Sequence, residues 1–241
     1  MKEKEDPLRP YKRSDIILEL SQQIDSIKIE HPVRVAIDGA DTAGKTTLAD
    51  ELATILQAKG RTVIRASIDG FHNPAEVRHQ FNERPIGYYN CSFNYDELIS
   101  ILLQPLGDRD NLKYKTRVFD YRKDQRTETN SIYAPVDAVL LFDGVFLLRK
   151  EIKGYWDYSI FVKVSFKTML LRAIKRDVKL FGSKANVIKR YNKRYIPGQK
   201  MYLRNEHPEK TAFVIVVNDV VERPKLRYNK SLELTPGTAL V

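Results

Sequence analysis

The sequence predicts an α/β fold with a doubly wound, parallel, five-stranded sheet. Short apolar runs rich in β-branched residues alternate with segments of helical periodicity, as parallel strands and their crossover helices do. A glycine-rich octapeptide joins the first of these runs to a helical segment. The chain has 241 residues, of which 42% are hydrophobic and 30% charged. This composition suits one globular domain, so we expect a single domain over residues 1–241.

Each strand is expected where a mostly apolar run is bounded by polar residues, because parallel strands are buried on both faces. Each helix is expected where apolar residues recur every three or four positions, as Leu48, Leu52 and Leu56 do. The strands are expected at residues 33–37, 62–68, 138–142, 158–164 and 213–217, and the helices at residues 14–27, 46–59, 95–103, 166–179 and 184–195.

The octapeptide at residues 39–46 reads G-A-D-T-A-G-K-T and matches the phosphate-binding pattern G-x-x-x-x-G-K-[ST]. Its glycines allow backbone N–H groups to surround phosphate oxygens, and the following helix adds unpaired donors and a positive dipole end. We expect Lys45 to reach the β- and γ-phosphates and the Thr46 hydroxyl to ligate Mg²⁺. A turn that binds nothing would explain neither residue. The expected nucleotide-binding residues are Gly39, Ala40, Asp41, Thr42, Ala43, Gly44, Lys45, Thr46 and Thr47.

Two carboxylates follow predicted strands, at the sheet edge where open α/β folds bind ligands. Asp143 ends the run 138–142, where it can hold Mg²⁺ or its water beside the phosphates. Asp69 ends the run 62–68, where it can face the γ-phosphate and accept the proton of an attacking hydroxyl. Either one alone could be an aspartate in a turn before glycine. Together with the octapeptide they predict a phosphoryl-transfer site in which Lys45 and Asp69 are catalytic.

Residues 71–94 are aromatic and polar without a clear period, so we expect an insertion over the sheet edge that binds the acceptor substrate. Its aromatic residues could stack on a base or simply pack, and Asn90 or Asp96 could hold ribose hydroxyls. Residues 1–13 and 222–241 are expected to be extensions. The aromatic residues in question are Phe71, Tyr88, Tyr89 and Phe93.

The charge balance indicates an anionic ligand. Lys and Arg number 41 against 31 Asp and Glu, a formal net charge of +10, which fits a nucleotide or a nucleic acid. Much of the excess lies in residues 172–204, where a solvated helix face is the plainer explanation. A nucleic-acid motor needs more chain than 241 residues provide, so we expect no nucleic-acid partner.

We expect a cytoplasmic protein without a membrane partner. The segment M-K-E-K-E-D-P-L-R-P has no apolar signal region, and no run approaches the roughly 20 apolar residues of a membrane span. The single cysteine, Cys91, excludes an intrachain disulfide and a thiolate-rich metal site, in agreement with a reducing compartment. A homo-oligomer is left open.

Together these segments resemble the uridine kinase family of P-loop nucleoside kinases, whose relatives act on pantothenate, phosphoribulose and nicotinamide riboside. A-I-D-G-A-D-T-A-G-K-T-T is similar to the family's loop, and S-I-D-G-F-H to its Asp-x-Phe-Tyr base motif, with His72 in the Tyr place. V-L-L-F-D-G-V-F resembles its Phe-Glu-Gly strand end, with Asp143 for Glu. The resemblance implies a P-loop kinase fold with an acceptor-binding insertion and a helical lid, and ATP and Mg²⁺ as cofactors.

Two further segments resemble motifs of this family. V-F-D-Y-R-K-D resembles its nucleoside-contacting segment, and Asp124 stands where the family has a base-reading His. Arg172, Arg176 and Asp177 match the motif of the lid, which we expect within the basic region 166–204. The substrate-binding residues expected from the resemblance and the insertion are Phe71, His72, Tyr89, Asp120, Tyr121, Arg122 and Asp124.

On a helix, Arg172 and Arg176 share a face, so both can point over a triphosphate when the lid closes. An arginine over the transferring group is worth on the order of 10³ in rate, so we expect both to be catalytic. Two solvated arginines are the alternative.

The sequence therefore predicts a Mg-ATP-dependent kinase of a small hydroxylated metabolite, first of all a nucleoside. Pantothenate or another acidic metabolite is the alternative acceptor. A nucleotide-dependent nucleic-acid-binding protein, in which the basic segment tracks phosphates, is the alternative of another class. The acidic acceptor is suggested by Arg65, Arg78, Arg84, Arg122 and Arg126.

Overall fold

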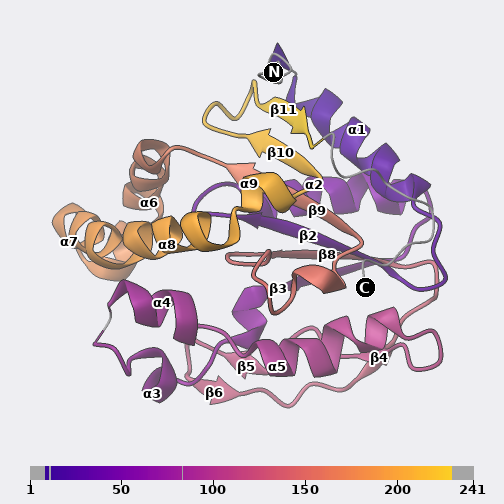
Figure 1. The fold of residues 1–241 in the computed structure, drawn as a ribbon, viewed down its shortest axis with the longest axis horizontal. Helices are drawn as coiled ribbons and strands as arrows, with labels where there is room; N and C mark the ends of the chain where they lie inside the picture. Colours follow the sequence, from indigo (N-terminus) through magenta and orange to yellow (C-terminus); the bar gives the residue numbers. More distant parts are fainter. Residues whose placement is uncertain (1–8, 11, 83, 230–241) are drawn as a thin grey trace.

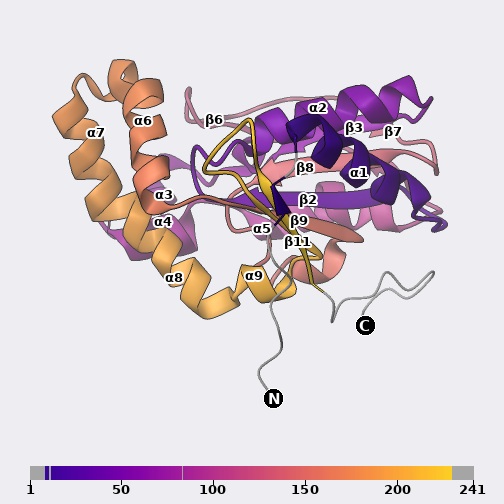
Figure 2. The same cartoon turned by 90° about the horizontal axis from the view of Figure 1, so that it is seen from above.

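The computed structural model describes residues 9–10, 12–82 and 84–229. At its centre lies a seven-stranded sheet whose strands are, in spatial order, β1 (Arg9–Pro10), β11 (Lys225–Tyr228), β10 (Val214–Val217), β9 (Tyr158–Lys163), β2 (Val33–Gly39), β8 (Val139–Gly144) and β3 (Val63–Ser67). Helices cover both faces of this sheet (Figures 1 and 2). The five strands from β10 to β3 run parallel, which confirms the predicted doubly wound sheet.

Two antiparallel strands extend the sheet beyond the five that the sequence predicts. β11 pairs with β10, and β1 pairs with β11. Both lie in the segments expected to be extensions, where strands of two and four residues are too short to give a periodic signal. The other parts of these segments, residues 1–8, 11 and 230–241, lie outside the described residues.

Two apolar layers hold the helices to the sheet. Val35 and Ile37 of β2 pack toward α1 (Arg13–Ser26) and α2 (Lys45–Ala58). Ala36 faces the opposite layer, which contains the segment after Tyr95 and the helix α8 (Ile196–Glu206). All seven residues of β2 are buried, so the sheet fixes the point at which this strand ends and the octapeptide begins.

Most predicted helices are present, with ends shifted by one or two residues. α1 and α2 replace the predictions 14–27 and 46–59, and α6 (Phe166–Phe181) replaces 166–179. The segments 95–103 and 184–195 each begin as an α-helix and end in a π-helical turn. They comprise α5 (Tyr95–Leu98) with Ile99–Leu103, and α7 (Lys184–Arg190) with Tyr191–Tyr195.

Several elements were not predicted. The insertion contains α3 (Ala75–Arg78) and α4 (Pro85–Cys91), which are too short to show a helical period. α8 follows directly on the π-helical turn, and Pro197 lies in its first turn, where a helix needs no N–H donor. The remaining short elements are α9 (Pro208–Thr211), the hairpin of β5 (Phe119–Asp120) and β6 (Gln125–Arg126), and the antiparallel pair of β4 (Lys113–Tyr114) and β7 (Ile132–Tyr133) that flanks this hairpin in the chain. Within the described residues, three 3₁₀ helices cover Ile68–Phe71, Pro105–Gly107 and Lys153–Tyr155.

The helices α6 and α7 form a hairpin that stands away from the sheet, at the left of both ribbon views (Figures 1 and 2). α6 begins at a Ser165 cap, whose hydroxyl oxygen accepts the Thr168 N–H, and it ends at Gly182 with φ +81°. Of the helices in residues 9–10, 12–82 and 84–229, not one has the length and apolar character needed to cross a bilayer.

Candidate active site

The octapeptide leaves β2 and enters α2 through two glycines that the backbone requires. At Gly39 the φ angle is +148°, and an added Cβ would lie 2.3 Å from the carbonyl oxygen of Val162. At Gly44 the φ angle is +95°, and an added Cβ would lie 2.8 Å from Nδ2 of Asn218. Any side chain would clash or be strained at both positions. The two glycines of the motif therefore allow the backbone angles and the close packing that this loop requires.

Lys45 lies at the first position of α2, and its side chain returns across this loop. Its Nζ donates a hydrogen bond to the carbonyl oxygen of Ala40 at 2.7 Å, and the residue is 9% exposed. Burial lowers the pKa of the Lys45 ammonium, while the nearby carboxylates of Asp41, Asp38 and Asp143 oppose this shift. The ammonium is held inside the loop, where the β- and γ-phosphates of a nucleotide would lie.

Thr46 and Asp143 meet at the edge of the sheet. The Thr46 hydroxyl donates to Oδ2 of Asp143 at 2.6 Å, and Asp143, the last residue but one of β8, lies beside Ile37 of β2 and Ser67 of β3. Because neighbouring parallel strands end together, residues 97 positions apart come into contact.

The Thr46–Asp143 pair fits a Mg²⁺ ion. Both groups offer the oxygen ligands that this ion prefers, and protein sites often supply only one or two such ligands beside the phosphates. No group of three or more His, Cys, Asp or Glu side chains within the described ranges could hold a metal ion by itself. Mg²⁺ would therefore be shared with a bound nucleotide.

Asp69 follows β3 in a 3₁₀ turn, Ile68–Phe71. Its side chain is 62% exposed, and its Oδ1 lies 3.5 Å from Nε2 of His72. Partial enclosure would raise the pKa of Asp69, but the His72 contact and the charges of Lys45 and Arg176 outweigh it, so the pKa is lowered. Asp69 is therefore an exposed, ionised carboxylate whose pKa is lowered in part by the Lys45 charge.

His72 is held by its other nitrogen and by its ring faces. Nδ1 lies 3.0 Å from the carbonyl oxygen of Ser92, so this nitrogen carries a proton. The ring centroid lies 4.6 Å from that of Phe93 and 5.0 Å from that of Tyr121. His72 thus lies between Asp69 and Tyr121, and its ring supports the Tyr121 ring.

Arg172 and Arg176 share a face of α6 but have different surroundings. Arg172 donates to the carbonyl oxygens of Thr42 at 3.3 Å and Asn218 at 2.7 Å, so it braces the phosphate-binding loop from outside. The Arg172 guanidinium thus contacts backbone carbonyls here, and the expectation that both arginines point over a triphosphate stays a prediction. Arg176 forms a bidentate pair with Asp177, is 57% exposed on its side chain, and its charge acts on Asp69.

Two residues expected to contact the substrate are used for packing. Phe71 is fully buried, and its ring packs 6.1 Å from that of Phe142. Tyr89 is 5% exposed, and its hydroxyl donates to Glu206 at 2.8 Å. Neither ring has an exposed face in this structure, so the expected substrate contact of both residues stays a prediction.

The hairpin of β5 and β6 carries two carboxylates that the backbone uses. Asp120 accepts the N–H groups of Arg122 at 3.0 Å and of Lys123 at 3.3 Å, so it closes the turn. Asp124 accepts the N–H of Ala75 at 2.8 Å and Nη2 of Arg78 at 2.7 Å. Asp124 therefore joins the hairpin to α3, and its expected role in contacting the substrate stays a prediction.

The same hairpin presents two side chains to the open side. Tyr121 is 38% exposed, with one face on His72. The Arg122 guanidinium carbon lies 5.8 Å from the Tyr121 ring centroid, and its Nε donates to the Tyr121 hydroxyl at 3.4 Å. Of the seven expected substrate-binding residues, Tyr121 and Arg122 thus have exposed groups near Asp69, and His72 lies between Asp69 and Tyr121.

Asp38 is a buried carboxylate that the sequence reading missed. It is fully buried and accepts hydrogen bonds from the Tyr202 hydroxyl and the Leu147 N–H. Burial raises its pKa to about 6, although these two hydrogen bonds act in the opposite direction. The signal available in the sequence was a carboxylate within an otherwise apolar strand. The Asp38 side chain joins the end of β2 to α8 through the hydrogen bond from Tyr202.

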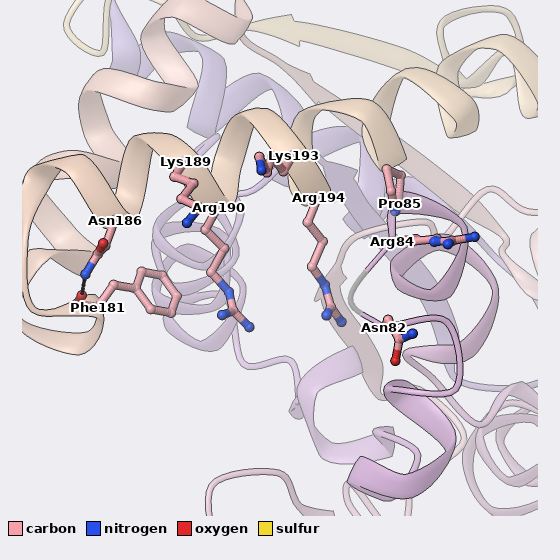
Figure 3. A pocket seen from close by; sticks show the side chains of 9 residues that line it. All are labelled: Asn82, Arg84, Pro85, Phe181, Asn186, Lys189, Arg190, Lys193 and Arg194. Carbon is pink, nitrogen blue, oxygen red and sulfur yellow. Dashed lines mark hydrogen bonds between the residues drawn. The ribbon is translucent and has the colours of Figure 1, made fainter.

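A basic groove of about 610 Å³ lies between the start of α4 and the helices of the α6–α7 hairpin (Figure 3). The side chains of Arg190 and Arg194 extend into it, and the Arg190 guanidinium lies 5.0 Å from the Phe181 ring centroid. Its described lining contains no acidic residue. The lining residues are Asn82, Arg84, Pro85, Phe181, Asn186, Lys189, Arg190, Lys193 and Arg194.

Residues 34–221 match the model of the Phosphoribulokinase / Uridine kinase family. A uridine kinase of Ureaplasma urealyticum is 27% identical over 150 residues, which are 61% of this chain and 70% of that protein. Uridine-cytidine kinase B of Dictyostelium discoideum is 27% identical over 180 residues, 72% of this chain and 70% of that one. The solved structure of a possible uridine kinase from Bacillus stearothermophilus superposes with a TM-score of 0.67 and 25% identity, over 84% and 97% of the two chains.

Proposed function

This chain belongs to the phosphoribulokinase/uridine kinase family, and from this premise we propose that it transfers the γ-phosphoryl group of ATP to a hydroxyl of a small metabolite, first of all a nucleoside. One observation carries the proposal. The Thr46–Asp143 contact at 2.6 Å lies at the strand ends from which Asp69, an exposed carboxylate sensitive to the Lys45 charge, also extends. Groups suited to a nucleotide and a group suited to a hydroxyl thus meet at one edge of the sheet.

In the proposed reaction the acceptor oxygen forms a bond to the γ-phosphorus, and the bond to the β–γ bridging oxygen breaks, which releases ADP. Lys45 binds the phosphate oxygens, and Thr46 and Asp143 would hold the Mg²⁺ that neutralises their charge when bound. The carboxylate of Asp69 accepts the hydroxyl proton. The pKa of Asp69 is not raised by its surroundings, so the carboxylate is ionised at neutral pH and can accept this proton.

For the arginines of the α6–α7 hairpin we propose different roles. Arg176 has the exposed guanidinium and an electrostatic effect on Asp69, so we assign it to the transferring group when the hairpin closes as a lid. Arg172 stabilises the phosphate-binding loop through the carbonyls of Thr42 and Asn218.

A nucleoside is the preferred acceptor because of Tyr121. Its ring is 38% exposed and packs against the ring of His72. Nε2 of His72 in turn lies 3.5 Å from the Asp69 carboxylate. An exposed aromatic ring beside the catalytic carboxylate offers a stacking surface for a planar base. Support for this acceptor also comes from the names of the relatives, which are uridine and uridine-cytidine kinases.

An acidic metabolite such as pantothenate is a second candidate, favoured by the basic groove. Its five basic side chains come from α4 and from the proposed lid, two segments that would approach each other around an acceptor (Figure 3). Arg122 adds a further positive charge near Tyr121.

The test is a screen for acceptor-dependent ADP release with Mg-ATP, using uridine, cytidine, pantothenate and sugar phosphates as acceptors. The proposal expects release with at least one nucleoside and none with the Lys45→Ala variant purified in the same way. Release with pantothenate alone selects the acidic acceptor. If no acceptor stimulates release and the protein binds nucleic acid with a steep salt dependence, the kinase proposal fails.

A further inference from the structure

The phosphate-binding loop contains an acid, Asp41, among residues that must receive an anion. Of the carboxylates that act on the Lys45 ammonium, Asp41 has the largest effect, and its charge also acts on Arg176. A carboxylate in this place repels the phosphates that Lys45 attracts, unless another group fixes it and offsets its charge.

Tyr88, on α4 of the insertion, provides that group. Its hydroxyl donates to Oδ2 of Asp41 at 2.8 Å, across 47 positions of the sequence. The same oxygen accepts a hydrogen bond from Nε2 of Gln199, on α8, at 3.3 Å. With Gln199 as its donor, the hydroxyl proton can point only toward Asp41. Three segments, the loop, the insertion and α8, therefore meet at one phenol oxygen.

The ring that carries this hydroxyl is firmly held. Tyr88 is buried, and the rings of Phe146 and Tyr195 pack edge-on against it, each with centroids 5.0 Å away. A Cβ at Gly198 would lie 2.5 Å from the Tyr88 ring, so only glycine permits this close approach. Burial and the Asp41 charge raise the pKa of Tyr88 well above its usual value, so the phenol stays a donor.

We propose that Tyr88 is a positioning residue for the nucleotide, which acts by holding the Asp41 carboxylate out of the path of the triphosphate. This inference rests on the proposed function, because it assumes that the loop binds ATP. It also gives the insertion an effect on the donor side of the site: α4 sets the geometry of the phosphate-binding loop through one hydrogen bond.

The test is direct binding of Mg-ATP, without any acceptor, by isothermal titration calorimetry. Tyr88→Phe removes the hydroxyl and keeps the ring. We expect it to weaken ATP binding about tenfold, because the hydrogen bond to the charged Asp41 carboxylate is lost. In the kinase assay the KM for ATP should rise by the same factor, while kcat changes less than about threefold.

The matched control is Tyr89→Phe. Tyr89 lies next to Tyr88 on α4, is equally buried, and also donates its hydroxyl to a carboxylate, but that carboxylate is Glu206 on α8. Its ATP affinity should equal that of the wild type. If Tyr89→Phe weakens ATP binding as much as Tyr88→Phe, the effect is general loosening of α4 and the proposal is overturned.

A second variant, Asp41→Asn, tests whether Tyr88 acts by keeping the Asp41 charge away from the triphosphate or only by stabilising the loop. Asp41→Asn removes the charge but keeps an oxygen that can accept from Tyr88. It should bind ATP at least as tightly as the wild type, and Tyr88→Phe added to it should cost less than about threefold. Weaker binding by Asp41→Asn alone contradicts the proposal, and that variant also serves if Tyr88→Phe does not fold. A wild type that binds no ATP refutes instead the proposed function.

Discussion

The phosphate-binding loop, residues 39–46, and the proposed acceptor-binding insertion, residues 71–94, lie at the same edge of the sheet but are held there differently. The loop lies between a fully buried strand and a 14-residue helix, and its conformation depends on Gly39 and Gly44. The insertion consists of two short helices and the connections between them. Its aromatic residues Phe71, Tyr88, Tyr89 and Phe93 are all buried, whereas the exposed Tyr121 belongs to the neighbouring β5–β6 hairpin.

The difference lies in which atoms would meet the ligand. The loop would bind phosphates with backbone N–H groups and two side chains, so a short motif specifies it almost completely. The acceptor side would bind with side chains, and Phe71 and Tyr89 show that a residue of the right type can be buried in packing. A binding surface of side chains is therefore a property of the whole fold, whereas a surface of backbone groups is largely local.

The largest effect is expected on the donor side, from Lys45→Ala. Loss of the ammonium removes the charge that the loop places among the phosphates, so kcat/KM should fall by about 10³ or more. Steady-state ADP release with the best acceptor measures it. The matched control is Lys59→Ala, just after α2, whose ammonium lies 3.7 Å from Asp25 and away from the site. Comparable loss in both variants would contradict the assignment.

A slightly smaller effect is expected on the acceptor side, from Asp69→Asn. Without the carboxylate the hydroxyl proton has no acceptor, and kcat should fall by about 10² to 10⁴. ATP binding, measured by calorimetry, should change little, because Asp69 lies on the acceptor side of the site. If kcat and ATP affinity fall together, Asp69 belongs to the metal and the two sides are not separable at this residue.

The strand β2, which leads into the phosphate-binding loop, contains a buried carboxylate, Asp38, whose ionisation lowers the free energy of unfolding. The pKa of Asp38 is raised from 3.8 to about 6, so the folded protein keeps this proton at pH values where the unfolded chain has lost it. The resulting stability is full below pH 4 and is lost as the pH rises through 6, a change of about 3 kcal/mol.

Urea unfolding of the wild type and Asp38→Asn at pH 4 and pH 7 measures this contribution. The stability of the wild type relative to the variant should fall by about 3 kcal/mol between these two pH values. A difference that stays constant would show that Asp38 has an ordinary pKa, and that the strand below the loop carries no such cost.

The smallest effects are expected from Arg122 and Asp124, two residues of the β5–β6 hairpin for which we expect different roles. Arg122→Ala should raise the KM for the acceptor by about three- to tenfold and leave the melting temperature unchanged, because its guanidinium contacts the exposed Tyr121 at the protein surface. Asp124→Ala should lower the melting temperature, because Asp124 joins the hairpin to Ala75 and Arg78. The opposite pattern would place Asp124 at the ligand and Arg122 in the scaffold.

Much of the architecture could be predicted from the chain. The five parallel strands and the helices α1, α2 and α6 follow from periodicity, and the strand-end argument predicts that Thr46 and Asp143 lie together, as they do at 2.6 Å. The short helices α3 and α4 could not be predicted, because four and seven residues give no period. Nor could the surroundings of Arg172, since the carbonyls that hold it belong to distant segments.

The fold class and the phosphate-binding loop follow from the amino-acid sequence alone. Both depend on local patterns: apolar runs buried on two faces, and glycines at backbone angles that other residues avoid. The three-dimensional packing was needed to show which side chains near Asp69 are exposed, that Arg172 contacts the loop, and that Tyr88 reaches Asp41. The physical reason is that burial and hydrogen bonding of side chains depend on neighbours far apart in the chain, here 47 positions for Tyr88 and Asp41.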